Sequence, residues 1–152
     1  MKKVSKSLTE TKTLAEIFIK KLKPSQQARV VTLVGDLGSG KTTFAQAIAK
    51  SLGIKVKITS PTFIIEKKYK IPILKNNSKP FLSIYKQLIH IDAYRLSGGR
   101  DLLALDWIEI VKNPQNLILL EWPEIVSTIL PSDRLEVKFK FIDDTKREIS
   151  FV

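Results

Sequence analysis

The stretch Gly35-Asp36-Leu37-Gly38-Ser39-Gly40-Lys41-Thr42 lies between two segments with different hydrophobic patterns. The run before it, residues 29–34, is almost continuously apolar, which is typical of a buried β-strand. The segment after it, residues 43–49, carries apolar residues at helical spacing. The sequence therefore predicts a buried strand, a tight glycine-containing loop and a helix in direct succession.

This loop matches the phosphate-binding pattern G-x-x-x-x-G-K-[ST]. Its glycines allow backbone N–H groups to turn inward, and the start of the following helix adds a partial positive charge. Lys41 can reach the β- and γ-phosphates of a nucleotide, and the Thr42 hydroxyl can bind Mg²⁺. Because the required strand and helix flank the loop, nucleotide binding is favoured over an ordinary glycine-rich turn.

Composition narrows the possible classes of protein. A chain of 152 residues suits one domain, residues 1–152. The absence of cysteine excludes disulfides and thiolate metal sites, and the one histidine excludes a His-rich zinc site. The N-terminus has no signal-peptide pattern and no apolar run is long enough to span a bilayer, so we expect a cytoplasmic protein without membrane contact.

The net charge of +11 is the one unusual global property. It suits a nucleic acid or an acidic protein surface as partner, or else a lysine-rich solvated surface without any such partner. The basic residues are scattered along the chain without interleaved aromatic residues, which favours the solvated surface.

Hydrophobic periodicity predicts the remaining elements. A helix is expected at residues 8–22, capped by Thr9 or Thr11, with an apolar stripe formed by Leu14, Ile17, Phe18 and Leu22. Further helices are expected at 101–111 (with Leu102, Leu105 and Ile108 inward) and at 124–130. Strands are expected at 55–58, 64–69, 88–92, 116–121, 135–141 and 147–152, with a loop or hairpin excursion between 70 and 86. This order predicts an α/β fold, a mostly parallel sheet with helices on both faces and a C-terminal antiparallel hairpin.

Two acids each end an apolar strand. Asp92 and Glu121 are expected at the carboxyl ends of parallel strands, the edge of the sheet where the glycine loop also lies. Two carboxylates beside a phosphate loop can hold Mg²⁺ and orient a water molecule. Either acid could instead cap the next helix, and their chemistry alone does not decide which of them binds the metal.

Other polar residues near these strands have less specific roles. The hydroxyls of residues 59–62 could sense the γ-phosphate, or this segment could be a turn determined by Pro61. Arg95 could stabilise charge on the phosphate or form a surface ion pair. His90 lies on the same side of its strand as Asp92 and is more often a core or supporting residue than a catalytic one. Trp107 is expected in the core, whereas Trp122 suits packing and nucleotide contact equally.

Four motifs occur together in this order: the loop at 35–43, Ser60-Pro61-Thr62-Phe63, His90-Ile91-Asp92-Ala93-Tyr94-Arg95-Leu96 and Glu121-Trp122-Pro123. The chain resembles the bacterial TsaE (YjeE) family, the ATPases of tRNA threonylcarbamoyladenosine biosynthesis, from about residue 10 to the C-terminus. The resemblance implies a P-loop NTPase-like fold and ATP hydrolysis that supports N6-threonylcarbamoylation of adenosine 37 in tRNAs reading A-starting codons. It also implies TsaD and TsaB as partners, with any tRNA contact indirect.

The resemblance further implies roles for individual residues. Thr42 and Glu121 would bind Mg²⁺, Asp92 would position the attacking water, and residues 60–63, including Thr62, would form the switch loop. Lys41, Asp92 and Thr62 would be the catalytic residues. The residues implied in nucleotide binding are Glu10, Asp36, Leu37, Gly38, Ser39, Gly40, Lys41, Thr42, Thr43, Trp122 and Arg147.

Two departures from the family pattern lie away from the phosphate-binding residues. The segment between Tyr69 and Leu88 is longer than usual, and Asp106 stands where the family commonly has glycine. A small-molecule kinase built on the same loop and a nucleotide-sensing adaptor remain alternatives. Transfer of the γ-phosphate to an acceptor other than water would indicate the kinase, and binding without a need for hydrolysis would indicate the adaptor.

Overall fold

The computed structural model describes residues 1–73 and 83–152, and its strands form one sheet. Within these residues the sheet has seven strands in the order β1-β7-β6-β2-β5-β4-β3. Their bounds are Lys2–Ser5 (β1), Arg29–Val34 (β2), Glu66–Lys70 (β3), Gln87–Asp92 (β4), Asn116–Glu121 (β5), Leu135–Phe141 (β6) and Arg147–Phe151 (β7). The predicted strands at 29–34, 88–92, 116–121, 135–141 and 147–152 are confirmed to within about a residue.

The centre of the sheet is parallel and its two sides are antiparallel. Strands β6, β2, β5 and β4 run parallel to one another. Strand β7 pairs antiparallel with β6 and β1, and β3 pairs antiparallel with β4. The α/β class and the C-terminal hairpin are thereby confirmed, while β1 and the β3–β4 pairing add antiparallel edges that the periodicity did not predict.

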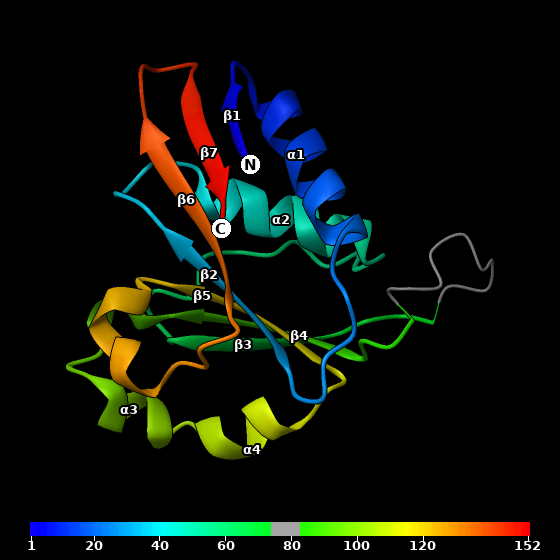
Figure 1. Cartoon of the computed structure of the whole chain (residues 1–152), viewed down its shortest axis with the longest axis vertical. Coiled ribbons are helices and arrows are strands. Elements are labelled where there is room, and N and C mark those ends of the chain that lie inside the picture. Colours follow the sequence, from blue (N-terminus) through cyan, green and yellow to red (C-terminus); the bar gives the residue numbers. More distant parts are fainter. Residues whose placement is uncertain (74–82) are drawn as a thin grey trace.

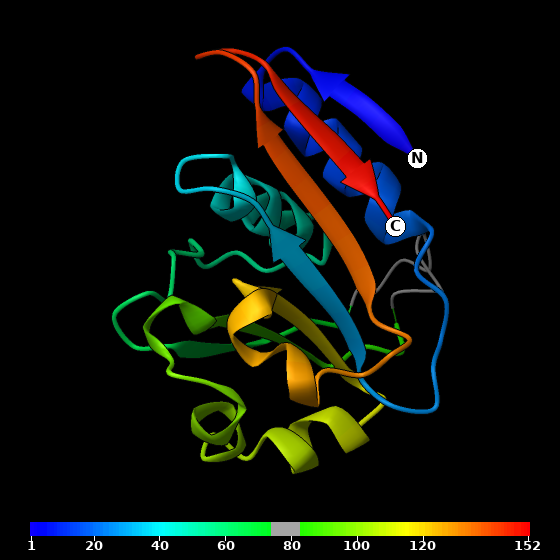
Figure 2. The ribbon, with the colours of Figure 1, turned by 60° about the vertical axis from the view of Figure 1, so that its left-hand side comes forward.

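Helices cover both faces of this sheet (Figures 1 and 2). Helices α1 (Leu8–Lys20) and α2 (Lys41–Ser51) pack on one face. The other face carries η2 (Ala93–Arg95), α3 (Gly99–Leu103), α4 (Trp107–Lys112) and η3 (Pro123–Ile129). Each side has its own cluster of buried apolar residues, and the strands β2, β4 and β5 contribute to both because their side chains alternate between the faces.

The first helix begins at Leu8, as predicted, but uses a different cap. The Ser7 hydroxyl accepts a hydrogen bond from the backbone N–H of Glu10, so neither Thr9 nor Thr11 is the N-cap. The helix ends at Lys20 rather than at 22. Its buried residues are Thr11, Ala15, Phe18 and Ile19, while Ile17 is 38% exposed, because the packing face is rotated relative to the predicted stripe.

Two predicted elements are wrong. Residues 55–58 form no strand; they belong to the loop after α2, where the Gln46 side chain donates to the Ile58 carbonyl at 2.8 Å. The helix predicted at 101–111 is split into α3 and α4 at Asp106, which has a left-handed φ of 58°. This break turns Trp107 into the core and leaves Ile108 51% exposed.

The excursion predicted between 70 and 86 falls mainly on residues 74–82, which lie outside the described residues. Strands β3 and β4 on either side of it pair antiparallel, as an excursion within a hairpin requires. Among the described residues, no helix combines the length and apolar character needed to cross a membrane.

Candidate active site

The glycine-containing loop connects the end of β2 to the start of α2. Gly35 has a φ of 153°, and a Cβ there would lie 2.6 Å from the backbone oxygen of Phe139 on β6, so no larger residue fits. Gly40 is the N-cap of α2 with a left-handed φ of 104° and no side-chain cap. The first N–H groups of α2 therefore have no side chain from the cap to bind, which is the arrangement that binds anions at helix N-termini.

Lys41 lies at the base of this loop and is only 5% exposed. Its Nζ donates to the carbonyls of Gly35 at 2.6 Å and Asp36 at 2.9 Å, and lies 4.6 Å from the ring centre of Trp122. Burial lowers the pKa of Lys41, and the nearby carboxylates, first Glu121 and then Asp92, oppose that shift. The two acids thus help to keep a buried ammonium group charged beside the helix N-terminus.

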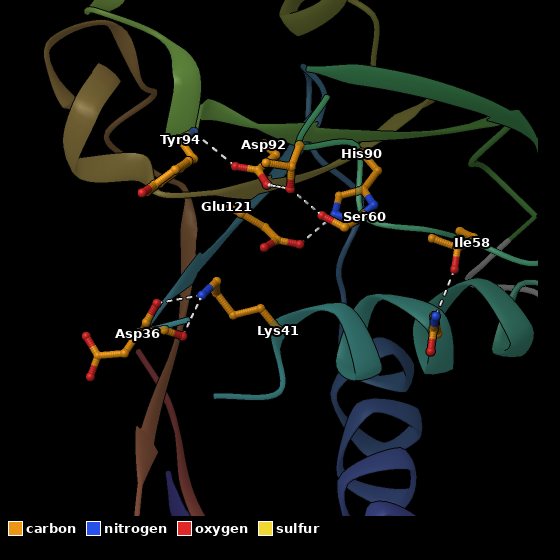
Figure 3. Close-up of polar contacts among 11 residues, drawn as sticks. Asp36, Lys41, Ile58, Ser60, His90, Asp92, Tyr94 and Glu121 are labelled. Atoms are coloured by element: carbon orange, nitrogen blue, oxygen red, sulfur yellow. Dashed lines mark hydrogen bonds and ion pairs between the residues drawn. The ribbon is translucent and has the colours of Figure 1, made fainter. Parts of the chain in front are cut away.

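The two strand-ending acids lie side by side. Asp92 of β4 and Glu121 of β5 are paired in register, and their exposed fractions are 2% and 3%. Asp92 accepts hydrogen bonds at both carboxylate oxygens, from Thr62 Oγ1 at 2.6 Å and from the Tyr94 backbone N–H at 2.9 Å. Figure 3 shows these acids on the side of the sheet that faces Lys41.

A cavity of about 290 Å³ connects the loop to the acids. It is lined by residues of the loop, the first turn of α2, the Ser60–Thr62 segment and the strand ends: Leu37, Gly38, Gly40, Lys41, Thr42, Thr43, Ser60, Thr62, Asp92, Tyr94, Glu121, Trp122 and Arg147. The rings of Tyr94 and Trp122 lie 5.2 Å apart, and Trp122 has a left-handed φ of 57°. An aromatic residue held in this backbone region next to a buried acid is typical of a functional site.

Three residues implied in nucleotide binding do not line this cavity. Glu10 lies in the first turn of α1, where its carboxylate accepts from the Lys6 backbone N–H at 2.6 Å. The Asp36 side chain is exposed and points away from the acids (Figure 3). Ser39 is buried, and its hydroxyl has no hydrogen-bond partner among the described residues.

Arg147 does reach the site, although it lies more than a hundred residues from the loop. Its guanidinium lies beside Gly40, where an added Cβ would be 3.2 Å from Nη1. Arg95, in contrast, stacks over the Phe63 ring at 4.6 Å. The cavity residue that sequence reasoning missed is Tyr94, whose signal was its place two residues after Asp92 within the same motif.

The site has oxygen ligands for the Mg²⁺ ion that accompanies a bound nucleotide. Among the described residues, no group of three or more His, Asp or Glu side chains could hold a metal ion alone. Mg²⁺ commonly keeps several waters and binds through one or two protein oxygens together with substrate phosphates. The Thr42 hydroxyl and the Glu121 carboxylate, both lining the cavity, suit this mode of binding.

A parallel β-sheet centre, a glycine loop that leads into a helix, a buried lysine and two strand-ending acids define an α/β protein of the P-loop nucleotide-binding class. The family model described as threonylcarbamoyl adenosine biosynthesis protein TsaE matches residues 5–149, and the chain belongs to this family.

Individual relatives agree with this assignment. The tRNA threonylcarbamoyladenosine biosynthesis protein TsaE of Bacillus subtilis is 37% identical over 142 residues, covering 93% of this chain and 78% of the relative. The protein of the same name from Rickettsia bellii is 39% identical over 139 residues, covering 91% and 85%. The crystal structure of Bacillus subtilis YdiB superposes with a TM-score of 0.71 at 34% identity, covering 99% of this chain and 83% of that one.

Proposed function

We propose that this protein is a single-domain, cytoplasmic, Mg²⁺-dependent ATPase that supports formation of N6-threonylcarbamoyladenosine at position 37 of tRNAs that read A-starting codons. Membership of the TsaE family and the printed names of the relatives support the pathway. The observation that carries the proposal is the single cavity in which Lys41, the N-terminus of α2 and both strand-ending acids meet.

Each part of the cavity has a role in phosphate chemistry. The N–H groups at the start of α2 and the Lys41 ammonium bind the phosphates, and Thr42 and Glu121 are the residues that would hold Mg²⁺. The metal, when bound, neutralises charge on the phosphates. Asp92 orients the attacking water through its carboxylate. The Thr62 hydroxyl donates a hydrogen bond to that carboxylate.

The rest of the nucleotide is expected to contact the side chains at the edge of the cavity. Trp122 offers an aromatic surface beside the Lys41 ammonium, and Arg147 adds a positive charge beside Gly40. We propose ATP rather than GTP as the substrate, because the sequence contains no Asn-Lys-x-Asp guanine motif.

We also propose that TsaD and TsaB are the partners and that tRNA contact is indirect. Two residues that line the cavity, Leu37 and Tyr94, are 88% and 58% exposed, and Phe63, which follows the lining residue Thr62, is 82% exposed. Exposed apolar residues that gather in one place are typical of protein contact surfaces. The described residues that line the cavity leave it open to bulk water. Because exclusion of bulk water strengthens the electrostatic interactions in an active site, we expect the isolated protein to hydrolyse ATP slowly.

The test is ATP hydrolysis by the wild type and by Lys41→Ala, each measured with and without TsaD and TsaB. We expect slow hydrolysis by the wild type alone, faster hydrolysis with both partners, and no hydrolysis above background by the variant. A rate that the partners do not change would contradict the partnership. Labelled γ-phosphate that moves to a small acceptor instead of water would indicate a kinase.

A further inference from the structure

His90 lies outside the cavity lining, yet it is the side chain that holds Glu121. We propose that His90 is a positioning residue, which fixes one oxygen of the Glu121 carboxylate so that the other is presented to a divalent cation. This inference rests on the proposed function, because it takes Glu121 as the carboxylate that meets Mg²⁺.

The geometry places the two side chains in direct contact. His90 on β4 is opposite Leu119 of β5, so Glu121 is its diagonal neighbour on the same face of the sheet. Its Nε2 lies 2.9 Å from Oε1 of Glu121 (Figure 3). The exposed fractions of the two side chains are 0% and 4%, so bulk water does not compete for this hydrogen bond.

The direction of this hydrogen bond follows from the chemistry of its partners. A carboxylate oxygen accepts, so Nε2 of His90 carries the proton and donates it. The other ring nitrogen, Nδ1, is buried and has no hydrogen-bond partner among the described residues. Among the described residues, Glu121 is therefore the hydrogen-bond partner of the imidazole, which lies between Ile89 and Ile91 on β4.

The two carboxylates of the site differ in how many of their oxygens the protein holds. Both oxygens of Asp92 accept hydrogen bonds, from Thr62 and from the Tyr94 backbone. In Glu121, Oε1 accepts from His90, and Oε2 has no donor among the residues that the structure describes. This asymmetry leaves Glu121 with a held carboxylate and one available oxygen, which is the arrangement that a metal ligand needs.

The experiment compares His90→Gln with His90→Asn. The glutamine amide nitrogen lies as far from the backbone as Nε2 and can donate to Glu121, whereas the asparagine amide is too short to reach it. Binding of Mn²⁺, used as a spectroscopic substitute for Mg²⁺, is measured by electron paramagnetic resonance with the non-hydrolysable analogue AMP-PNP. Binding of AMP-PNP in EDTA is measured separately, together with the melting temperature of each variant.

We expect His90→Asn to lower Mn²⁺ affinity about 10-fold or more, since loss of a group that holds a metal ligand commonly has this effect. His90→Gln should keep Mn²⁺ affinity within about three-fold, and metal-free binding of AMP-PNP should change little in either variant. His90→Leu, which has no donor, should show the same loss as His90→Asn and replaces it if that variant does not fold.

A double variant separates positioning from general damage. In a Glu121→Gln background, His90→Asn should cause no further loss of Mn²⁺ affinity, because the group that it positions is already gone. Equal Mn²⁺ binding by wild type and His90→Asn, or an additive loss in the double variant, would overturn the inference. If the wild type itself bound no Mn²⁺ with AMP-PNP, the proposed function would fail instead.

Discussion

The two buried acids at the edge of the sheet are equivalent in backbone position and different in their hydrogen bonds. Asp92 and Glu121 are paired in register, so the strands alone assign neither of them to the metal. Asp92 has a donor at each oxygen, whereas Glu121 has a donor at one. The difference lies in the residues that surround them, and it agrees with the metal role that the family resemblance implies for Glu121.

We therefore predict that Glu121→Gln weakens the Mg²⁺ dependence of nucleotide binding more than Asp92→Asn does. The amide of glutamine is a poorer Mg²⁺ ligand than a carboxylate, and loss of a direct ligand should lower apparent Mg²⁺ affinity by 10-fold or more. Asp92→Asn should mainly reduce the hydrolysis rate. Titration of Mg²⁺ at saturating AMP-PNP measures the first effect, and the reverse ranking would show that the two roles are exchanged.

The buried ammonium group predicts a pH dependence. Burial lowers the pKa of Lys41 from its ordinary value of 10.5, so this group loses its proton at a lower pH than an exposed lysine does. Because the phosphates are attracted to the charged form, ATP affinity should fall as the pH rises from 7 toward 10.5. Equilibrium binding of AMP-PNP between pH 7 and 10 measures this.

Lys41→Arg is the control for that titration, because a guanidinium group stays protonated throughout this pH range. Any alkaline loss of affinity that Lys41 causes should be absent from the variant. The same fall in the arginine variant would show that another group titrates.

At the scale of elements, the break between α3 and α4 depends on one backbone conformation. Asp106 has a φ of 58°, and its side chain makes no capping hydrogen bond to α4. Residues other than glycine are strained in this region of backbone conformation, although aspartate tolerates it better than most. The family resemblance implies glycine at this position, and glycine adopts the observed φ without strain.

We predict that Asp106→Gly stabilises the protein by up to about 1 kcal/mol, which is the scale of the strain that a side chain experiences in this region. Asp106→Val should destabilise it, because a β-branched residue tolerates positive φ poorly. Urea denaturation measures both changes. ATP hydrolysis should be unchanged by the glycine variant, because Asp106 does not line the cavity. A glycine variant less stable than the wild type would show that the strain is relieved in another way.

At the scale of the whole molecule, the cavity joins segments from most of the chain. The loop after β2, the Ser60–Thr62 segment before β3, the ends of β4 and β5 and the start of β7 all contribute to it. Both faces of the sheet and the C-terminal hairpin must be formed before these groups meet. Nucleotide binding should therefore favour the folded state as a whole over the unfolded chain.

We predict that Mg²⁺ and AMP-PNP at 100 times the dissociation constant stabilise the protein by about 2.7 kcal/mol. For a chain of this size, that is a rise in melting temperature of roughly 5–10 °C. Lys41→Ala should retain a wild-type melting temperature without nucleotide and should lose the rise. Unfolding of this variant in the absence of nucleotide would show that Lys41 supports the loop through its bonds to the Gly35 and Asp36 carbonyls.

The sequence by itself determined the strand, loop and helix at residues 29–49 and the acids at the ends of β4 and β5. These features depend on local hydrophobic patterns and on a motif of fixed spacing, so they can be recognised without knowing the neighbours. Together with the four motifs they were sufficient to predict the phosphate loop, the fold class and the family.

Only the tertiary structure decided which distant residues meet at this loop. Arg147 reaches Gly40 because β7 pairs with β6, and Glu10 is left out because it binds the backbone at the start of α1. His90 acts on Glu121 through a contact between neighbouring strands, and Asp106 divides a helix that periodicity predicted as continuous. Such contacts depend on how elements pack against one another, and a pattern along the chain does not contain that information.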